Sequence, residues 1–353
     1  MKRFKNLYPE LCDFENLLLA AKKAQRGKRA IRQVAEFNHN LEYELLTLKE
    51  ELEAQTYKPG TYRTFTINDP KTRLISAAPY RDRVVHHALC NIVEPLIERT
   101  FIHDSYACRK GKGTHAAVDR YTQFSRQYPY VLKCDIRKYF PSIDHEILKS
   151  LLRRKIGCPN TLWLLDTIID GSNPQPLRED YFPGDNLFTP YTRRKGLPIG
   201  NQTSQFFANV YLNPLDHFIK ETLGSRAYLR YVDDFVVFGY DKKTLWNIRD
   251  RVAVFLNTEL RLHLHPHKQN VFPVAVGCDF LGYFIFPTHR RIRASSGWRF
   301  ARNLRGMAEQ YRTGVVSLPK IQQRVASWFG HARHADTYGL RATLLSSVVF
   351  RRA

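Results

Sequence analysis

The sequence lacks the features of several protein classes. Its six cysteines lie at least 18 residues apart and form no Cys-x-x-Cys pair. We therefore expect reduced thiols and no cysteine zinc site. No stretch of about 18 apolar residues is present, which excludes a membrane-spanning helix. The basic N-terminus is not followed by the apolar segment of a secretory signal. We therefore expect a cytoplasmic protein without a membrane partner.

Acidic residues are scarce relative to basic ones. The 353 residues include 33 Asp and Glu against 55 Lys and Arg, which gives a formal net charge of +22. An excess of this size favours a polyanionic partner, either nucleic acid or anionic lipid. A basic surface that only keeps the protein in solution is the alternative that composition leaves open.

Half of the positive excess lies near the C-terminus. Residues 288–353 carry 13 basic and 2 acidic side chains, a net charge of +11. Apolar residues recur there at helical spacing, as in Phe300, Leu304 and Met307, so the segment is not a disordered arm. The intervening basic residues fall mainly on other helix faces and include Arg299, Arg302 and Arg305. This pattern predicts a basic helical unit that binds along a nucleic-acid backbone.

The order of elements predicts an α+β fold rather than regular βαβ alternation. We expect a helical region over 13–56 and helices over 84–97 and 203–222. We expect strands at 61–67 and 72–77, joined as a hairpin, and at 130–135. A second hairpin over 228–239 has its two strands meeting at Asp233-Asp234, and the polar stretch 172–195 is expected to be a loop insertion.

Three aspartates are the candidate catalytic residues. Asp233 and Asp234 are adjacent carboxylates between apolar strands, and they repel each other unless a cation binds there. An exposed turn is the alternative, but the glycine that such turns favour is missing. Asp135 ends another strand pattern, and the three acids converge if that strand lies beside the hairpin. Oxygen ligands of this kind favour two Mg²⁺ ions and phosphoryl transfer.

These acids belong to a longer series of motifs. In chain order the motifs are Arg73-Leu74-Ile75, Asp82-Arg83-Val84-Val85, Ser105-Tyr106-Ala107-Cys108-Arg109, Asp135 with Phe140, Gly196-Leu197-Pro198-Ile199-Gly200-Asn201-Gln202-Thr203-Ser204-Gln205, Tyr231-Val232-Asp233-Asp234, Leu264 to Lys268 and Phe280-Leu281-Gly282-Tyr283. Together they resemble the reverse transcriptase motifs, in that family's order, over roughly residues 60–350. The resemblance implies an RNA-directed DNA polymerase shaped like a right hand. It divides the chain into an N-terminal helical extension (1–60), fingers (61–130), an antiparallel-sheet palm (131–287) and a basic helical thumb (288–353).

The resemblance also implies roles for individual residues. Asp135, Asp233, Asp234 and the Ile136 backbone would hold two Mg²⁺ ions, for which Mn²⁺ is an expected substitute. The residues implied at the incoming nucleotide are Lys71, Arg73, Ile136, Phe140, Ile199 and Gly200. Phe140 matches a steric gate against ribonucleotides, and Lys268 matches a lysine that protonates pyrophosphate. The residues expected to contact primer and template are Phe280, Leu281, Gly282, Arg299, Arg302 and Arg305.

One motif departs from the common bacterial pattern. Many bacterial reverse transcriptases have Pro-Gln-Gly where this chain has Pro198-Ile199-Gly200, and Ser-Pro where it has Ser204-Gln205. The string resembles that of diversity-generating retroelements. That resemblance implies error-prone cDNA synthesis, mutagenic at adenines, from a template-repeat RNA. It also implies a small, basic, pentameric accessory variability protein as partner.

Two alternatives remain from the sequence. A group II intron-type or defence-associated reverse transcriptase is one alternative. The Ser204-Gln205 string and the expected lack of a nuclease or large maturase domain argue against the intron type. An inactive palm that only binds RNA is the other alternative. Retention of all three aspartates argues against it.

Overall fold

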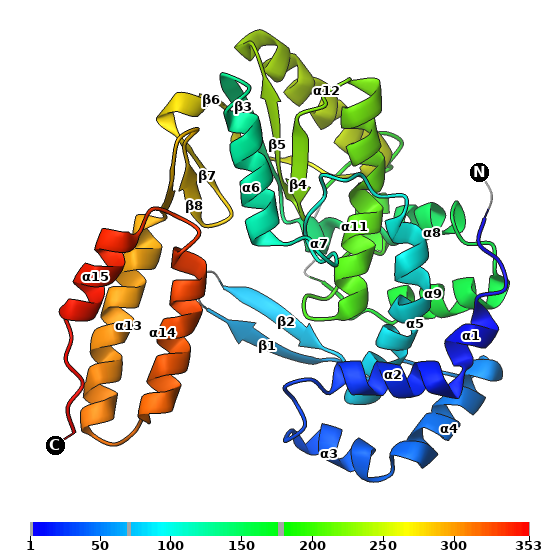
Figure 1. Cartoon of the computed structure of the whole chain (residues 1–353). Coiled ribbons are helices and arrows are strands. Elements are labelled where there is room, and N and C mark those ends of the chain that lie inside the picture. The colour runs from blue at the N-terminus through cyan, green and yellow to red at the C-terminus, as the bar shows by residue number, and fades with distance from the viewer. Residues whose placement is uncertain (1–2, 69–71, 176–179, 353) are drawn as a thin grey trace.

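The structure is a computed structural model that describes residues 3–68, 72–175 and 180–352 (Figure 1). An N-terminal group of helices packs around one long helix. The group consists of α1 (Tyr8–Cys12), α2 (Phe14–Ala24), α3 (Arg32–His39) and α4 (Leu41–Glu53), and the long helix is α5 (Tyr80–Glu98). Leu45, Leu48 and Leu52 of α4 are buried, as their three- and four-residue spacing requires of one helix face.

Between α4 and α5 the chain forms a two-stranded antiparallel hairpin. Strand β1 (Arg63–Ile67) pairs with β2 (Arg73–Ala77), and every residue of β1 is exposed. In Figure 1 the hairpin lies below the central sheet, between the N-terminal helices and the C-terminal ones. Lys71 falls outside the described residues.

A four-stranded antiparallel sheet forms the centre of the molecule. Its strands are β3 (Tyr130–Ile136), β4 (Tyr228–Tyr231), β5 (Asp234–Gly239) and β6 (Leu264–Pro273), in the spatial order β4-β5-β3-β6. Alternate side chains enter two different cores. On β5, Phe235 and Val237 join the larger core, whereas Val236 and Phe238 join a second one. Both faces of the sheet are therefore covered.

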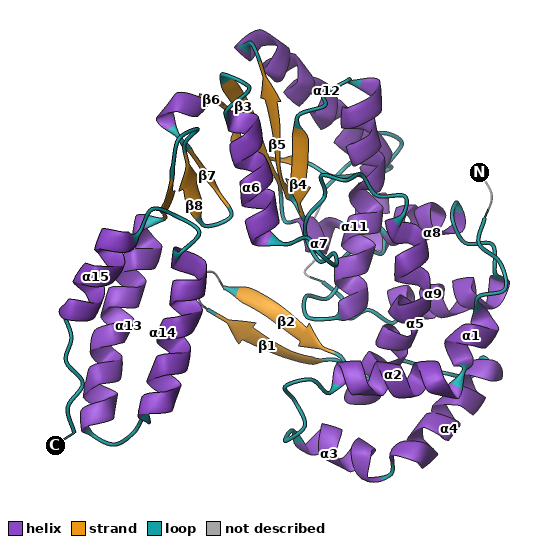
Figure 2. Cartoon of the chain, viewed as in Figure 1, coloured by secondary structure: helices purple, strands orange, loops and turns teal. Residues whose placement is uncertain are grey.

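Helices cover the two faces of this sheet (Figure 2). The helices of this part of the chain are α6 (Thr114–Ser125), α7 (Tyr139–Ser142), α8 (His145–Arg153), α9 (Pro159–Asp170), α10 (Thr189–Thr192), α11 (Gln202–His217), the π-helical turn η1 (Phe218–Thr222) and α12 (Lys242–Leu260). Helix α12 contacts β3, β5 and β6, while α6 contacts β4. The sheet thus holds its strand ends at a fixed position between helical layers.

The C-terminal part begins with a second, smaller sheet. After the 3₁₀ turn η2 (Val274–Val276), strands β7 (Cys278–Phe280), β8 (Tyr283–Ile285) and β9 (Arg290–Ile292) pair in that order. Three helices follow, α13 (Ala294–Arg312), α14 (Leu318–Ala332) and α15 (Tyr338–Ser346). Phe300, Leu304 and Met307 of α13 form a small core with residues of α14, which confirms the helical pattern seen in the sequence.

The α+β class is confirmed, with several differences in detail. The helical region 13–56 is three helices, separated by turns over residues 25–31 and at Asn40. Strand β9 lies beyond the expected palm boundary at 287 but pairs with β8, so the smaller sheet crosses that boundary. The division into four named regions stays a prediction. Across the described ranges, no helix is both long enough and apolar enough to cross a bilayer.

Candidate active site

The candidate site lies where β3 and β5 run side by side. In their antiparallel register Asp135 stands directly opposite Asp234. Asp234 shares the face of Val236 on β5, and Asp135 shares the face of Val131 on β3, so both carboxylates start from the sheet face that bears the second core. The amide of Ile136 donates to the carbonyl of Asp233 at 3.2 Å, which draws the β4–β5 turn against the end of β3. The predicted convergence of these strands is therefore present.

The turn that carries Asp233 is shifted by one residue from the expected position at Asp233-Asp234. Asp234 already belongs to β5, so the turn consists of Val232 and Asp233. Val232 has a φ of 56°, a left-handed conformation that costs a β-branched residue about 1–3 kcal/mol. Its carbonyl accepts a hydrogen bond of 3.0 Å from Nη1 of Arg230. This bond opposes relaxation of the strained turn and so fixes Asp233.

A buried ion pair lies beneath this turn. Arg230 and Asp216 of α11 are both fully buried and make two contacts of 2.7 Å. Tyr228 donates to the same carboxylate at 2.6 Å, and Arg230 Nη1 also reaches Asn209 at 3.2 Å. Sequence reasoning missed this support. The signal was the presence of a charged residue, Arg230, within the apolar strand 228–231.

Two lysines lie against the candidate carboxylates. Nζ of Lys268 donates to Oδ2 of Asp135 at 2.9 Å, and Nζ of Lys133 lies 3.9 Å from Oδ2 of Asp234. Lys268 reaches Asp135 because the β3–β6 register shifts between Cys134 and Ile136, which leaves Asp135 opposite a bulge in β6. Lys268 is the lysine for which the resemblance implies protonation of pyrophosphate, and that role stays a prediction.

Burial changes the acidity of the two adjacent carboxyls. Burial, then the charge of Asp135, raises the pKa of Asp233 to about 6, and the positive charges of Lys268 and Arg73 oppose part of this rise. Burial raises the pKa of Asp234 to about 7, against the opposing charge of Lys133. Both groups therefore hold protons more tightly than an exposed carboxyl does.

These carboxylates fit a divalent cation. Oδ1 of Asp234 is buried and has no hydrogen-bond partner, a costly state for an acceptor unless a cation binds to it. The oxygen-only donors match hard cations such as Mg²⁺. Within the described ranges, no three His, Cys, Asp or Glu side chains are already gathered as a metal cage. The ammonium groups of Lys268 and Lys133 supply the positive charge beside the carboxylates instead.

We expect Asp233 and Asp234 to make the free energy of unfolding depend on pH. Both carboxyls have pKa values raised from 3.8, to about 6 and about 7, so the folded chain binds more protons than the unfolded chain between these limits. Their contribution to the free energy of unfolding therefore falls as the pH rises from about 4 to about 7. In thermal unfolding across this pH range, the stability of Asp233→Asn should fall less with rising pH than that of the parent. A steeper fall of stability in the variant would contradict this expectation. In a second measurement, added Mn²⁺ should stabilise the parent more at pH 8 than at pH 5.

The Gly196–Gln205 string lies against the β1–β2 hairpin. The amide of Ser76 on β2 donates to the carbonyl of Ile199 at 3.1 Å. Gly200 has a φ of 128°, and a Cβ there would lie 3.3 Å from Ile75, so this close approach requires glycine. Arg73 is on the same strand, and its charge acts on Asp233. The structure thus places Ile199 and Gly200 against the strand that carries Arg73.

Phe140 and Ile136 lie just beyond Asp135. The Ile136 side chain is fully buried, so only its backbone is open to a role at the site. Phe140 is half-buried in α7, and its ring contacts that of Tyr139 with centroids 5.6 Å apart. Its carbonyl accepts from the amide of Leu197 at 2.9 Å. Phe140 is thereby tied to the segment that carries Ile199.

The expected primer-contacting residues divide into two groups. The ring of Phe280 is fully buried and stacks on Tyr121 at 5.2 Å, so it supports the smaller sheet rather than facing a primer. Leu281 and Gly282 form the β7–β8 turn, with φ values of 48° and 93°, and both are partly exposed. The arginines lie further along the chain, on α13. Arg302 and Arg305 are exposed, and Arg299 is half-exposed.

Several known proteins are similar to this chain in sequence or structure. YkfC of Escherichia coli (strain K12) is 26% identical over 295 residues, which cover 72% of this chain and 73% of YkfC. The group II intron-encoded protein LtrA of Lactococcus lactis subsp. cremoris is 22% identical, over 79% of this chain but only 57% of LtrA. The solved structure of apo telomerase from Candida tropicalis gives a TM-score of 0.49 at 12% identity, over 68% of this chain and 49% of that one.

A family model gives the most direct match. The model described as Reverse transcriptase (RNA-dependent DNA polymerase) matches residues 58–285, which is more than half of the chain and includes all three aspartates. Members of this family copy RNA templates from deoxynucleoside triphosphates and use divalent metal ions. The chain belongs to the reverse transcriptase family, with a right-hand polymerase fold and RNA-directed DNA polymerase activity.

Proposed function

We propose that the chain is the reverse transcriptase of a diversity-generating retroelement, making adenine-mutagenic cDNA from a template-repeat RNA. The observation that carries this proposal is Ile199, an apolar residue beside the β1–β2 hairpin where many bacterial relatives have glutamine. Its partners would be that RNA, the RNA–DNA duplex, deoxynucleoside triphosphates and a small basic pentameric accessory protein. The cytoplasm stays the expected compartment.

The named side chains act together in this proposal. The carboxylates of Asp135, Asp233 and Asp234 would hold two Mg²⁺ ions, which activate the primer 3′-hydroxyl and stabilise the leaving pyrophosphate when bound. Arg73 binds the triphosphate, a role proposed for Lys71 as well, and Lys268 donates a proton to the pyrophosphate. Phe140 excludes the 2′-hydroxyl of ribonucleotides. Leu281, Gly282 and the α13 arginines contact the duplex. These roles assign residues 61–130 to the fingers, 131–287 to the palm and 288–353 to the thumb.

The low fidelity has a physical basis at position 199. A glutamine side chain there would form hydrogen bonds near the incoming nucleotide and the template base, whereas Ile199 offers only apolar contact. The Ile199 backbone is already fixed by Ser76, so a substitution changes the side chain and leaves its position. Loss of a polar interaction worth about 1–3 kcal/mol relaxes discrimination by roughly 5- to 150-fold.

We expect Ile199→Gln to lower misincorporation opposite template adenine by about 5-fold or more, because it restores that polar contact. The measurement is sequencing of cDNA made on a defined RNA template, with errors scored by template base. Ile199→Leu, which keeps an apolar side chain of the same volume, is the matched control and should retain the parental error rate. An unchanged adenine error rate in Ile199→Gln would refute the role of this residue.

A group II intron-type reverse transcriptase is the second candidate function. The similarity to LtrA over 79% of this chain favours it. The same sequencing experiment separates the two candidates, because an intron-type enzyme copies adenine as accurately as the other bases. A uniform error spectrum with the parental enzyme and its purified accessory protein would therefore favour the intron-type function.

A further inference from the structure

Two parts of the proposed nucleotide site are joined through the backbone. The Leu197 amide donates to the Phe140 carbonyl, and the Ile199 carbonyl, two residues later, accepts from Ser76. Helix α7, which carries Phe140, and the segment that carries Ile199 are therefore connected by backbone hydrogen bonds. β2 contacts only the Ile199 end of this segment, so other residues must hold the end that begins at Arg193.

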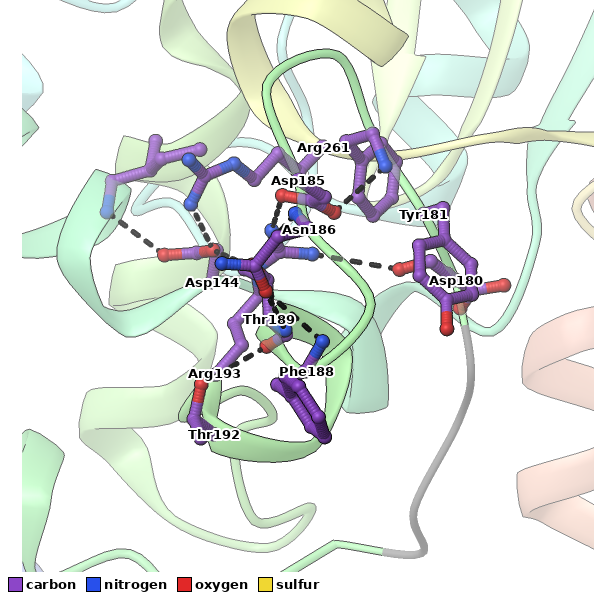
Figure 3. A network of polar contacts seen from close by, with 12 residues as sticks. Asp144, Asp180, Tyr181, Asp185, Asn186, Phe188, Thr189, Thr192, Arg193 and Arg261 are labelled. Atoms are coloured by element: carbon purple, nitrogen blue, oxygen red, sulfur yellow. Dashed lines mark hydrogen bonds and ion pairs between the residues drawn. The ribbon is translucent and has the colours of Figure 1, made fainter.

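A buried network of ion pairs holds that end (Figure 3). The side chains of Arg193, Asp144 and Asp185 are only 5%, 2% and 3% exposed. Nε of Arg193 lies 3.4 Å from Oδ2 of Asp144, and Nη2 of Arg193 pairs with Asp185. Arg261 binds the same Asp144 oxygen at 2.8 Å. Two arginines and two aspartates thus compensate one another where an unpaired charge would be costly.

Asp144 connects this network to the nucleotide side. Its Oδ1 accepts from the amides of Glu146 and Ile147 at 2.9 and 3.1 Å, and so caps α8. Its backbone forms an antiparallel bridge with Lys195, two residues after Arg193. The chain on either side of Asp144 therefore runs directly along the segment that leads to Ile199.

The loop insertion completes the surroundings of Arg193. The guanidinium of Arg193 lies 5.3 Å from the ring centroid of Phe182, and the Phe182 amide donates to Asp185 at 2.8 Å. The Phe182 ring in turn stacks on His263 at 4.9 Å. This part of the loop, which the sequence indicated only as a polar insertion, folds around one arginine next to the catalytic sheet.

We propose that Arg193 is a positioning residue that sets the placement of Phe140 relative to Ile199. It acts through Asp144, Asp185 and the backbone of the intervening segment, without contact with the nucleotide. Sugar selection and base selection then depend on one shared network and change together when it is broken. This inference rests on the proposed assignment of Phe140 and Ile199 to the incoming nucleotide.

The test is Arg193→Gln, which removes the positive charge and its ion pairs with Asp144 and Asp185. The measurement is kcat/KM on an RNA template for a matched deoxynucleotide, the corresponding ribonucleotide and a mismatched deoxynucleotide. We expect both discrimination ratios to change by about 10- to 100-fold, because small misplacements at a reacting centre have effects of that size. Arg193→Lys, which keeps the charge but not the planar fork, should recover part of each ratio.

If Arg193 only stabilises the fold, the experiment gives a different result. Both ratios are independent of the fraction of folded enzyme, so lower activity with unchanged ratios overturns the inference. Asp185→Asn, which leaves the Asp144–Arg261 pair in place, gives the same test if Arg193→Gln does not fold. Arg153→Gln is the control, because it breaks a 2.5 Å pair with Asp166 that joins α8 to α9 instead.

Parallel variants separate this inference from the function on which it rests. Phe140→Ala should relax sugar discrimination and Ile199→Gln should sharpen base discrimination. If neither changes its ratio, the proposed nucleotide site itself is wrong. If both do while Arg193→Gln and Asp185→Asn leave the ratios unchanged, only the positioning role of Arg193 is refuted.

Discussion

Asp233→Asn is expected to abolish cDNA synthesis, with a loss of about 10³-fold or more, equivalent to about 4 kcal/mol of transition-state stabilisation. Asp233 lies at the tip of the turn that Ile136 and Arg230 hold against β3. Asparagine preserves the shape of the side chain but removes the negative charge that a divalent cation requires. The measurement is primer extension on an RNA template with Mg²⁺ and, separately, with Mn²⁺.

RNA binding should largely survive this substitution. The basic surface of the C-terminal helices is unchanged, and one charge is lost from a chain whose net charge is +22. Asp250→Asn is a matched control, because Asp250 is an exposed residue of α12 that pairs with its neighbour Arg249. If Asp233→Asn still extends the primer at the parental rate, the assignment of the metal-binding carboxylates is wrong.

Arg230→Met is expected to lower the free energy of unfolding by about 3–5 kcal/mol. It leaves the buried carboxylate of Asp216 without its cation and the strained Val232 carbonyl without its donor. Denaturant unfolding followed by circular dichroism measures the change. The substitution of both partners, Arg230→Met with Asp216→Leu, should recover much of the stability, because a buried ion pair is often replaced by apolar side chains at little cost.

Activity distinguishes the two roles of Arg230. The double variant regains stability but still lacks the hydrogen bond to Val232, so its primer extension should stay well below that of the parent. Arg153→Gln removes a partly exposed pair and should cost no more than about 1 kcal/mol. A double variant that is no more stable than Arg230→Met would show that the ion pair does not account for the loss.

Local sequence patterns predicted the elements of the fold well. Short apolar runs within 130–136 and 228–239 are typical of strands buried on both faces, and both segments form strands of the central sheet. Spacing of three and four residues predicted the buried faces of α4 and α13 for the same reason. The break of the 13–56 region into three helices was missed, since the apolar stripe of α4 does not show where the chain turns.

The candidate site was predictable only in part. Asp135 and Asp234 stand out because acids interrupt apolar strands, and the register of β3 and β5 places them opposite each other. The partners of Arg230 and Arg193 were not predictable, because each pair joins residues whose spacing follows no period of helix or strand. The bulge that turns Lys268 toward Asp135 was equally hidden, since it depends on the pairing of two distant strands.

The exposure of the β1–β2 hairpin affects which substitutions this enzyme tolerates. Phe65, Ile67 and Leu74 are each more than 40% exposed, so these side chains contribute little to the free energy of folding. Substitutions at such positions are nearly neutral for stability, yet they lie on the hairpin that holds Ile199 and carries Arg73. Directed evolution can therefore substitute these hairpin positions at little cost in the free energy of folding.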